Sequence, residues 1–294
     1  MSLPKFEYFE PKTVKEACSI LSDKHKENVR VLAGGTDILV RMKDRIITPK
    51  CLVNIKEIPN LDYITYDEKE GLRIGALATL SSIETSLVIQ EKFPLLATSA
   101  GDIGSPQIRN LGTIGGNLCH ASPSADTAPA LIALGATVKL VEPKGERVLL
   151  LEDFFIDPFK TELNAAGLLT EIQVPTLPPK SGGVYLKYGK KEMVDIAIVG
   201  VAAVITLEST NGVCKDIKIV LGAVAPIPLR AKKAEEILKG KKPEEGIIEK
   251  AARVASEEAR PITDIRGSAE YRKEMVKVFT RRATNQALMI AKAN

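Results

Sequence analysis

The chain has 294 residues, of which 45% are hydrophobic, so it can bury a large core and is long enough for two or three domains. Its small net charge of +4, its 4% aromatic content and its lack of tryptophan argue against a nucleic-acid-binding protein, which usually carries a basic stripe with aromatic residues. The four scattered cysteines match no metal or disulfide pattern, and we see no signal sequence or membrane-spanning stretch, so we expect a soluble cytoplasmic protein.

The first part of the chain predicts alternating helices and strands. Thr13 and Glu16 form a capping box at the start of an amphipathic helix, and a β-rich run follows. Asp126 suits the N-cap position of a later helix, and residues 143–146 suit a hairpin turn. From these patterns we expect helices over about residues 13–25, 38–43, 82–91, 94–101 and 126–134, and strands over about residues 29–33, 51–55, 72–80, 137–141, 147–151 and 167–174.

Residues 174–183 are rich in proline and glycine and have the composition of a linker, which predicts a domain boundary. Beyond this linker the pattern changes to long β-branched runs followed by helical periodicity. We expect an antiparallel meander of three strands over about residues 184–188, 197–207 and 213–224, and then helices over about residues 231–238, 243–258 and 269–292.

Two glycine-rich segments, 31–38 and 113–117, each place a Gly-Gly pair beside a threonine. Glycine lets backbone amides approach a ligand closely, and successive amides in such turns bind anions. Two such segments suggest one extended anionic ligand held from two sides, such as the pyrophosphate of a dinucleotide. Neither segment matches the GxGxxG fingerprint or the phosphate loop. The first pair alone favours an ordinary tight turn, but residues 109–126 are too rich in small, hydroxyl and amide side chains for a core.

The two segments together resemble a known family. Residues 33–39 read Ala-Gly-Gly-Thr-Asp-Ile-Leu, residues 113–117 read Thr-Ile-Gly-Gly-Asn, and residues 121–126 read Ala-Ser-Pro-Ser-Ala-Asp. They resemble the FAD-binding subunit of molybdenum hydroxylases, a family that includes the medium subunit of aerobic carbon monoxide dehydrogenase and the flavin domain of xanthine dehydrogenase. The resemblance covers nearly the whole chain. It implies an α+β protein with the FAD-binding fold of the vanillyl-alcohol-oxidase (PCMH) type. Two α/β lobes would span residues 1–55 and 56–176, and the meander with its helices would span residues 177–294.

The resemblance also implies which residues bind FAD. The first segment would wrap the pyrophosphate, with Thr36 donating a hydrogen bond, and the second would supply further donors. Asp126 would accept from a sugar hydroxyl, and it can cap a helix at the same time. Leu169 would pack on the flavin or adenine, Ile196 would lie at the flavin face, and Lys187 would lie near the isoalloxazine unless it is an ordinary solvated lysine. The implied set is Val31, Leu32, Ala33, Gly34, Gly35, Thr36, Asp37, Ile38, Ile103, Thr113, Ile114, Gly115, Gly116, Asn117, Ser122, Asp126, Leu169, Lys187 and Ile196.

The function implied is that of an oxidoreductase subunit that binds FAD noncovalently and transfers electrons. Electrons would arrive from an iron–sulfur small subunit, in a complex with a molybdopterin large subunit, and leave to an acceptor such as NAD+ or a quinone. The flavin supplies the chemistry, so we predict no catalytic side chain and no metal ligand in this chain. The adjacent Cys119 and His120 lack a third orienting group, and the scattered cysteines argue against an iron–sulfur cluster. Two alternatives remain, a self-sufficient flavin oxidase or reductase of the same fold and a non-enzymatic module with structural FAD.

Overall fold

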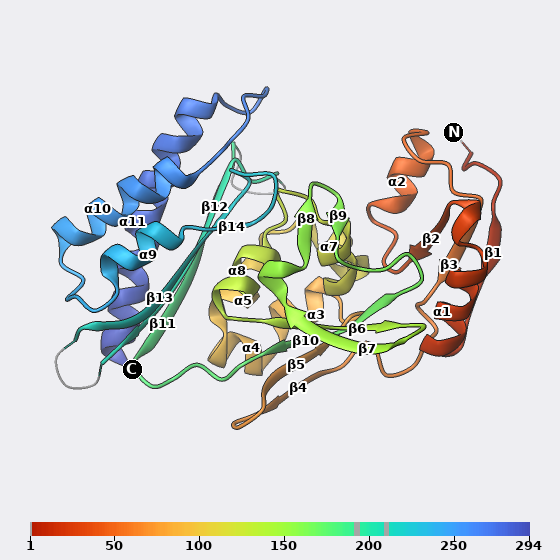
Figure 1. Ribbon diagram of the computed structural model, residues 1–294, viewed down its shortest axis with the longest axis horizontal. Coiled ribbons are helices and arrows are strands. Elements are labelled where there is room, and N and C mark those ends of the chain that lie inside the picture. Colours follow the sequence, from red (N-terminus) through yellow and green to blue (C-terminus); the bar gives the residue numbers. More distant parts are fainter. Residues whose placement is uncertain (1, 191–194, 209–211) are drawn as a thin grey trace.

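The computed structural model describes residues 2–190, 195–208 and 212–294. They form an N-terminal lobe, a middle lobe and a C-terminal domain, each built on one main sheet, with the middle lobe between the other two (Figure 1). No helix within these ranges combines the length and the apolar character needed to cross a membrane.

The N-terminal lobe is a small parallel sheet with helices beside it. Its strands lie in the order β1-β3-β2, and the central strand is buried along its whole length. Thr13 accepts a hydrogen bond from the amide of Glu16 and starts the first helix as predicted, and Ala17 and Leu21 of that helix are buried in the lobe core. The elements are β1 (Glu7–Phe9), α1 (Val14–Asp23), η1 (His25–Glu27), β2 (Val29–Leu32), α2 (Ile38–Lys43) and β3 (Cys51–Asn54).

The middle lobe is an antiparallel sheet of five strands, in the order β4-β5-β10-β6-β7, with six short α-helices, one 3-10 helix and a separate small hairpin. Its strands are β4 (Ile64–Asp67), β5 (Gly71–Gly75), β6 (Thr137–Glu142), β7 (Gly145–Leu150) and β10 (Leu168–Val174). Its helices are α3 (Leu80–Thr85), α4 (Leu87–Lys92), α5 (Pro94–Gly101), α6 (Pro106–Leu111), α7 (Ile114–His120), α8 (Thr127–Ala133) and η2 (Leu151–Asp153), and the hairpin is β8 (Phe155–Asp157) with β9 (Lys160–Thr161).

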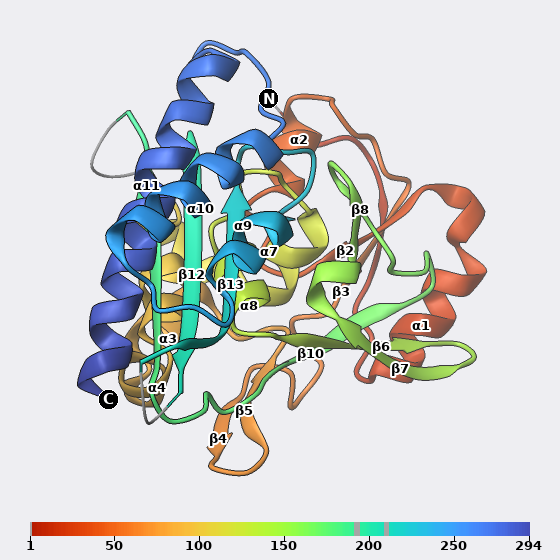
Figure 2. The same ribbon diagram turned by 60° about the vertical axis from the view of Figure 1, so that its left-hand side comes forward.

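The C-terminal domain is an antiparallel sheet covered by long helices (Figure 2). The sheet is buried between α11 on one side and helices α5 and α8 of the middle lobe on the other. A Cβ added at Gly182 would lie 2.1 Å from the carbonyl oxygen of Ala287, so α11 rests directly on the strand backbone. The elements are β11 (Ser181–Tyr188), β12 (Val199–Leu207), β13 (Cys214–Gly222), β14 (Leu229–Arg230), α9 (Lys232–Leu238), α10 (Glu245–Glu258) and α11 (Ala269–Ala293).

The structure differs from the sequence prediction in several elements. The single helix predicted over residues 82–91 is two helices, α3 and α4, because the backbone is extended at Ser86 between them. The strand predicted over residues 72–80 ends at Gly75, because the chain turns there and Thr79 caps α3 by accepting from the amide of Ser82. Helices α6 and α7 were not predicted, since glycine and proline in residues 104–116 lower helix propensity. The meander of three strands has a fourth, because β14 pairs with β13 over Val220 and Leu221.

Candidate functional site

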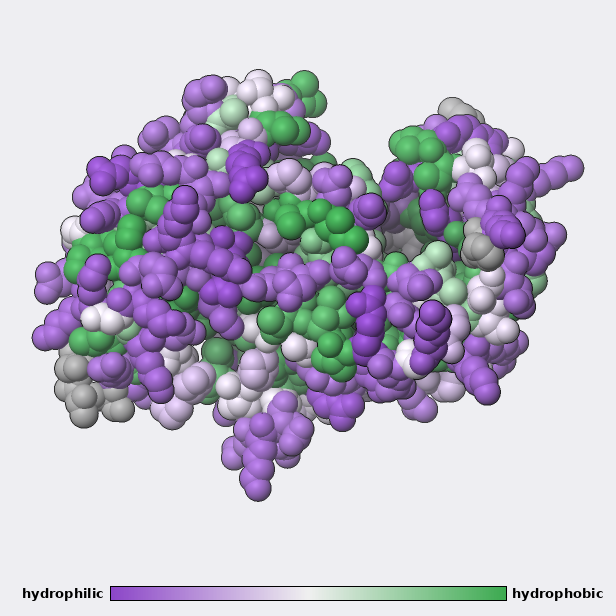
Figure 3. Space-filling model, viewed as in Figure 1, coloured by the Kyte–Doolittle hydropathy of each residue, from purple (hydrophilic) through white to green (hydrophobic). Residues whose placement is uncertain are grey.

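A cavity of about 1170 Å³ is lined by residues of all three parts of the chain. In Figure 3 the surface is hollowed between the N-terminal lobe, on the right, and the rest of the molecule. Its volume exceeds the roughly 300–1,000 Å³ of pockets for drug-sized ligands, so the cavity suits an extended ligand. The predicted FAD-binding residues that line it are Val31, Ala33, Gly34, Gly35, Thr36, Asp37, Ile38, Ile103, Thr113, Gly115, Gly116, Asn117, Ser122, Asp126, Leu169 and Ile196.

Three other predicted residues lie behind the cavity wall. Leu32 and Ile114 are buried core residues, 7% and 0% exposed. Lys187 is held in an ion pair behind the wall, where its ammonium group donates to the backbone oxygen of Asp102 at 2.7 Å and to Asp126 at 2.9 Å. A direct contact of these three side chains with FAD stays a prediction.

The first glycine segment presents a row of unpaired backbone amides to the cavity. In the described part of the chain, the amide groups of residues 34–37 donate to no protein acceptor. Gly35 has a φ of +83°, a left-handed conformation that turns the chain between β2 and α2 and exposes these amides. Successive free amides of this kind form an anion-binding nest, and Arg41 of α2 lines the same cavity. The nest therefore fits a pyrophosphate group.

The two glycine segments are in contact with each other across the lobes. A Cβ added at Gly34 would lie 2.1 Å from the carbonyl oxygen of Leu111, so the two backbones touch there. Conversely, a Cβ added at Gly112 would lie 3.6 Å from the hydroxyl oxygen of Thr36. Segments that are about 75 residues apart in the sequence thus form one wall of the cavity, as two halves of a single cradle.

The second segment contributes shape more than backbone donors. It forms the start of α7, where the amides of Ile114 and Gly115 donate to Ala78 and Ala76, and the amide of Gly116 donates to the hydroxyl of Thr113 at 3.1 Å. The amide of Asn117 is also used, since it donates to the carbonyl of Thr113. Within the described residues, the backbone amide of Thr113 and the side-chain amide nitrogen of Asn117 donate to no protein acceptor, while the side-chain oxygen of Asn117 accepts from Thr127 at 2.6 Å. Of the expected second set of donors, the fold therefore leaves these two groups free for a ligand.

Asp126 lies on the cavity wall at the junction with the C-terminal domain. It occupies the N-cap position of α8, but its side chain makes no capping hydrogen bond, so this part of the prediction was wrong. Instead Oδ1 accepts from the hydroxyl of Tyr185 at 2.6 Å and Oδ2 accepts from Lys187 at 2.9 Å. The residue is only 4% exposed, and burial raises the pKa of the carboxyl group to about 6 in spite of the nearby ammonium.

Sequence reasoning missed several charged and aromatic residues that line the cavity. Arg41 lies four residues after Asp37, about one turn along α2. The sequence alone does not show that the two side chains lie on the same side, because the bounds of the helix must be known first. Phe159, in the β8–β9 turn, carries no sequence signal for a ligand site. The cavity lining that was missed includes Arg30, Arg41, Phe159, Arg260, Asp264, Arg266 and Arg272.

Arg272 fixes the C-terminal side of the cavity. It is 3% exposed, and one guanidinium nitrogen donates to the carbonyl oxygens of Ile198 and Ala223 at 3.2 and 3.1 Å. Another nitrogen donates to Asp264 at 2.7 Å. The pKa of Asp264 is lowered to about 2, chiefly because the backbone amide of Arg266 donates to the carboxylate. Arg272 thus ties the loop before α11 to the ends of two strands at the cavity.

The adjacent Cys119 and His120 do not form a nucleophile pair. Burial raises the pKa of the Cys119 thiol to about 12 and lowers the pKa of His120, so neither group is activated. His120 instead lies 3.5 Å from Asp37 of the N-terminal lobe, and its ring packs edge-on against Phe159 at 5.2 Å.

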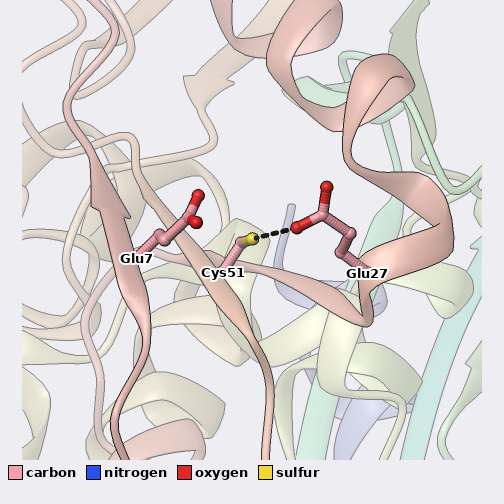
Figure 4. A group of neighbouring side chains, drawn as sticks. All are labelled: Glu7, Glu27 and Cys51. Carbon is pink, nitrogen blue, oxygen red and sulfur yellow. Dashed lines mark hydrogen bonds between the residues drawn. The ribbon is translucent and has the colours of Figure 1, made fainter.

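One group of potential metal ligands lies away from the cavity, in the N-terminal lobe (Figure 4). Glu7, Glu27 and Cys51 offer ligand atoms within 4.8 Å of one another. The ammonium group of Lys24 forms ion pairs with both glutamates, at 3.2 and 3.1 Å, so a cation already balances this group. Burial raises the pKa of the Cys51 thiol and keeps it protonated.

Comparison with known proteins places this cavity in a family. Residues 4–177 match the FAD binding domain in molybdopterin dehydrogenase, and residues 184–287 match the CO dehydrogenase flavoprotein C-terminal domain. The glyceraldehyde dehydrogenase medium chain of Sulfolobus acidocaldarius is 35% identical over 95% of this chain and 97% of its own. The carbon monoxide dehydrogenase medium chain of Afipia carboxidovorans is 34% identical over 98% of both chains.

A solved structure gives the same result for the fold. A chain of carbon monoxide dehydrogenase from Hydrogenophaga pseudoflava superimposes with a TM-score of 0.93 and 36% identity, over 98% of both chains. The fold expected from the sequence, an α+β FAD-binding fold of the PCMH type, is therefore confirmed, and so is FAD as the cofactor. The chain belongs to the family of FAD-binding oxidoreductase subunits of the molybdenum hydroxylases.

Proposed function

We propose that this chain is the electron-relay subunit of a heteromeric molybdenum hydroxylase. Electrons pass from the molybdopterin of a large subunit to the iron–sulfur clusters of a small subunit, and from these clusters to the FAD of this chain. The FAD then passes them to an acceptor such as NAD+ or a quinone. Relatives that carry the names "medium chain" and "FAD-subunit" support this assembly. The complex acts in the cytoplasm under this proposal.

The observation that carries the proposal is the row of free amides at residues 34–37, which lines the same cavity as Asn117. Amide nests bind phosphate oxygens, so these groups hold the pyrophosphate, with Thr36 and Asn117 as side-chain donors. Arg41 adds a positive charge on the same wall. Asp126 accepts from a sugar hydroxyl only through lone pairs that Tyr185 and Lys187 leave unused.

FAD, when bound, stores two electrons and exchanges them one at a time or as a pair. This chain's own residues position it and keep water away from it. Leu169, Ile103 and Ile196 are the apolar residues of the predicted set that line the cavity beside the polar cradle. The positive charge of Lys187 is partly balanced by Asp126, and any effect of Lys187 on the flavin is transmitted through this ion pair.

The test is to purify the chain, measure its absorption, denature it and assay the released flavin. We expect noncovalent FAD near one equivalent, and reoxidation of the photoreduced protein by NAD+ or by a soluble quinone. Copurification from the native organism tests the partners. A chain that binds no FAD after reconstitution overturns the proposal. A lone chain that turns over small substrates with its own FAD supports a self-sufficient flavoenzyme instead.

A further inference from the structure

Two links join the N-terminal lobe to the middle lobe at the edge of the cavity. In the first, Asp37 lies 3.5 Å from the imidazole of His120. In the second, the guanidinium of Arg41 lies over the ring of Phe159, 5.3 Å from its centroid. His120 packs against the same ring at 5.2 Å with an interplanar angle of 61°. These four residues, called here the Phe159 bridge, all line the cavity.

The backbone under the bridge is held in an uncommon conformation. Phe159 has a φ of +60°, and Ala121, the residue that ends α7, has a φ of +50°. The amide of Phe159 donates to the carbonyl of Ala121 at 2.9 Å, so the two left-handed residues are joined directly. Left-handed backbone is unfavourable for a bulky residue and tends to occur at ligand clamps and switch regions. The fold thus keeps the ring in this position at a cost.

Hydrophobic burial of the Phe159 ring does not offset the cost of its left-handed backbone. Phe159 is 55% exposed although it lines the cavity, so its ring stands at the boundary between cavity and solvent. Figure 1 shows the β8–β9 hairpin on the side of the middle lobe that faces α2 of the N-terminal lobe. The bridge therefore lies at the mouth of the cavity.

The ring is also poorly placed to stack on FAD. Its face is covered by the guanidinium of Arg41, and His120 packs against it edge-on. An aromatic ring whose partners are both protein groups serves to connect them. The contacts are weak and partly exposed, so they can break and reform without unfolding either lobe.

We propose that the Phe159 bridge is a gate that closes the two lobes over the FAD cavity and sets the rates at which FAD enters and leaves. This inference rests on the proposed FAD site. A gate that is closed in both the free and the loaded protein slows binding and release equally, whereas a residue that contacts FAD slows release alone. The two rate constants therefore distinguish the gate from a direct FAD contact.

The experiment compares Phe159→Ala and Phe159→Leu, which both remove the cation–π contact with Arg41, with the wild-type full-length chain. Apoprotein is mixed with FAD to obtain the association rate from flavin fluorescence, and loaded protein is mixed with excess apoflavodoxin as a trap to obtain the release rate. Each variant is expected to raise both rate constants roughly fivefold, a factor that corresponds to the stabilisation provided by one exposed cation–π pair. The dissociation constant, which is the ratio of the two rate constants, should stay nearly unchanged.

The matched control is Ile156→Ala in the same hairpin, since Ile156 is 44% exposed but does not line the cavity. It should leave both rates unchanged. Phe159→Gly should give the same rates as Phe159→Ala with a higher unfolding midpoint, because glycine tolerates the positive φ. A rise in the release rate alone, or no change in either rate, overturns the gate. A wild-type chain that binds no FAD overturns the proposed function itself.

Discussion

The phenolic oxygen of Tyr185 lies 2.6 Å from Oδ1 of Asp126, and this hydrogen bond joins the C-terminal sheet to the cavity wall of the middle lobe. A Cβ added at Gly200 would lie 2.7 Å from the same phenolic oxygen, so glycine on the neighbouring strand leaves room for it. Lys187, two residues along β11 on the same face, holds the other carboxylate oxygen. One strand thus supplies both donors to a single buried carboxylate.

Asp126 should make the stability of the protein depend on pH. Its pKa in the folded chain, about 6, lies above the ordinary value of 3.8, so the folded state binds more protons between these values. The contribution of Asp126 is therefore most favourable below about pH 4 and is lost as the pH rises through 6. We expect the stability of wild type relative to Asp126→Asn to fall by about 1–3 kcal/mol across this window, measured by urea unfolding.

Tyr185→Phe is the companion variant for this prediction. It removes a donor that lowers the pKa of Asp126, so the loss of stability should extend to higher pH, with an overall cost of about 1.5–3 kcal/mol. If the difference between wild type and Asp126→Asn stays constant with pH, the carboxyl group does not titrate in this window and the explanation by burial is incorrect.

The glycines of the cradle should tolerate no side chain. Gly34→Ala places a Cβ 2.1 Å from the carbonyl oxygen of Leu111 and forces the lobes apart, and Gly116→Val places one 2.8 Å from the hydroxyl of Thr113. Gly35→Val adds a β-branched residue at a φ of +83°. We expect each variant to lose FAD, as measured by absorption and equilibrium dialysis, while the C-terminal domain stays folded.

Gly246 in α10 is the matched control for the cradle variants. An added Cβ there meets no atom within 4 Å, so Gly246→Ala should keep full FAD content and gain up to about 1 kcal/mol of stability from helix propensity. If Gly35→Val and Gly116→Val both retain FAD at the level of this control, the two glycine segments do not form the cradle.

Asn117 should act through its side-chain nitrogen. Asn117→Ala removes the donor and is expected to weaken FAD binding by roughly tenfold or more, the value of a hydrogen bond to a charged group. Asn117→Asp keeps the shape and the bond from Thr127 but places negative charge near the pyrophosphate, so the loss should be greater. Fluorescence titration of the apoprotein gives both dissociation constants, and equal affinity of Asn117→Ala and wild type would contradict the assignment.

Arg272 should be a major determinant of stability. Arg272→Met leaves the carbonyls of Ile198 and Ala223 without this donor and removes one of the two arginines that pair with Asp264, which should cost about 3–5 kcal/mol in chemical unfolding. Arg281→Met, at an exposed position on the same helix, should change the stability by less than about 0.5 kcal/mol. Similar effects of the two substitutions would show that the buried contacts of Arg272 are not what stabilises this loop.

The sequence sufficed for the parts of the site that depend on local backbone chemistry. Gly34 and Gly35 follow a short strand and precede a helix, and this pattern correctly predicted a turn, whereas its role in binding a ligand was expected only from the two segments together. The same reasoning misjudged the second segment, because glycine in a sequence suggests free amides. The amides of Gly115 and Gly116 are used inside α7, and Gly115 is required because Ala76 lies 2.7 Å from its would-be Cβ.

The parts that could not be predicted depend on contacts between distant segments. Asp126 was predicted to cap a helix because it comes directly before a helical pattern in the sequence. Its actual partners, Tyr185 and Lys187, approach it only when the C-terminal sheet packs on the middle lobe. The strand predicted over 72–80 failed for a related reason. Residues on both sides of the turn at Gly75 are buried, so the hydropathy is continuous where the backbone direction changes.

The contact of Gly34 with Leu111 joins backbone to backbone, and this limits how the protein can change over time. Most packing conflicts in a core can be relieved by trimming the opposing side chain, but the atom that faces Gly34 is a carbonyl oxygen, which every amino acid carries. No substitution at position 111 can therefore make room for a larger residue at position 34. A selection for second-site suppressors of Gly34→Ala should yield changes that shift a whole lobe and none at position 111.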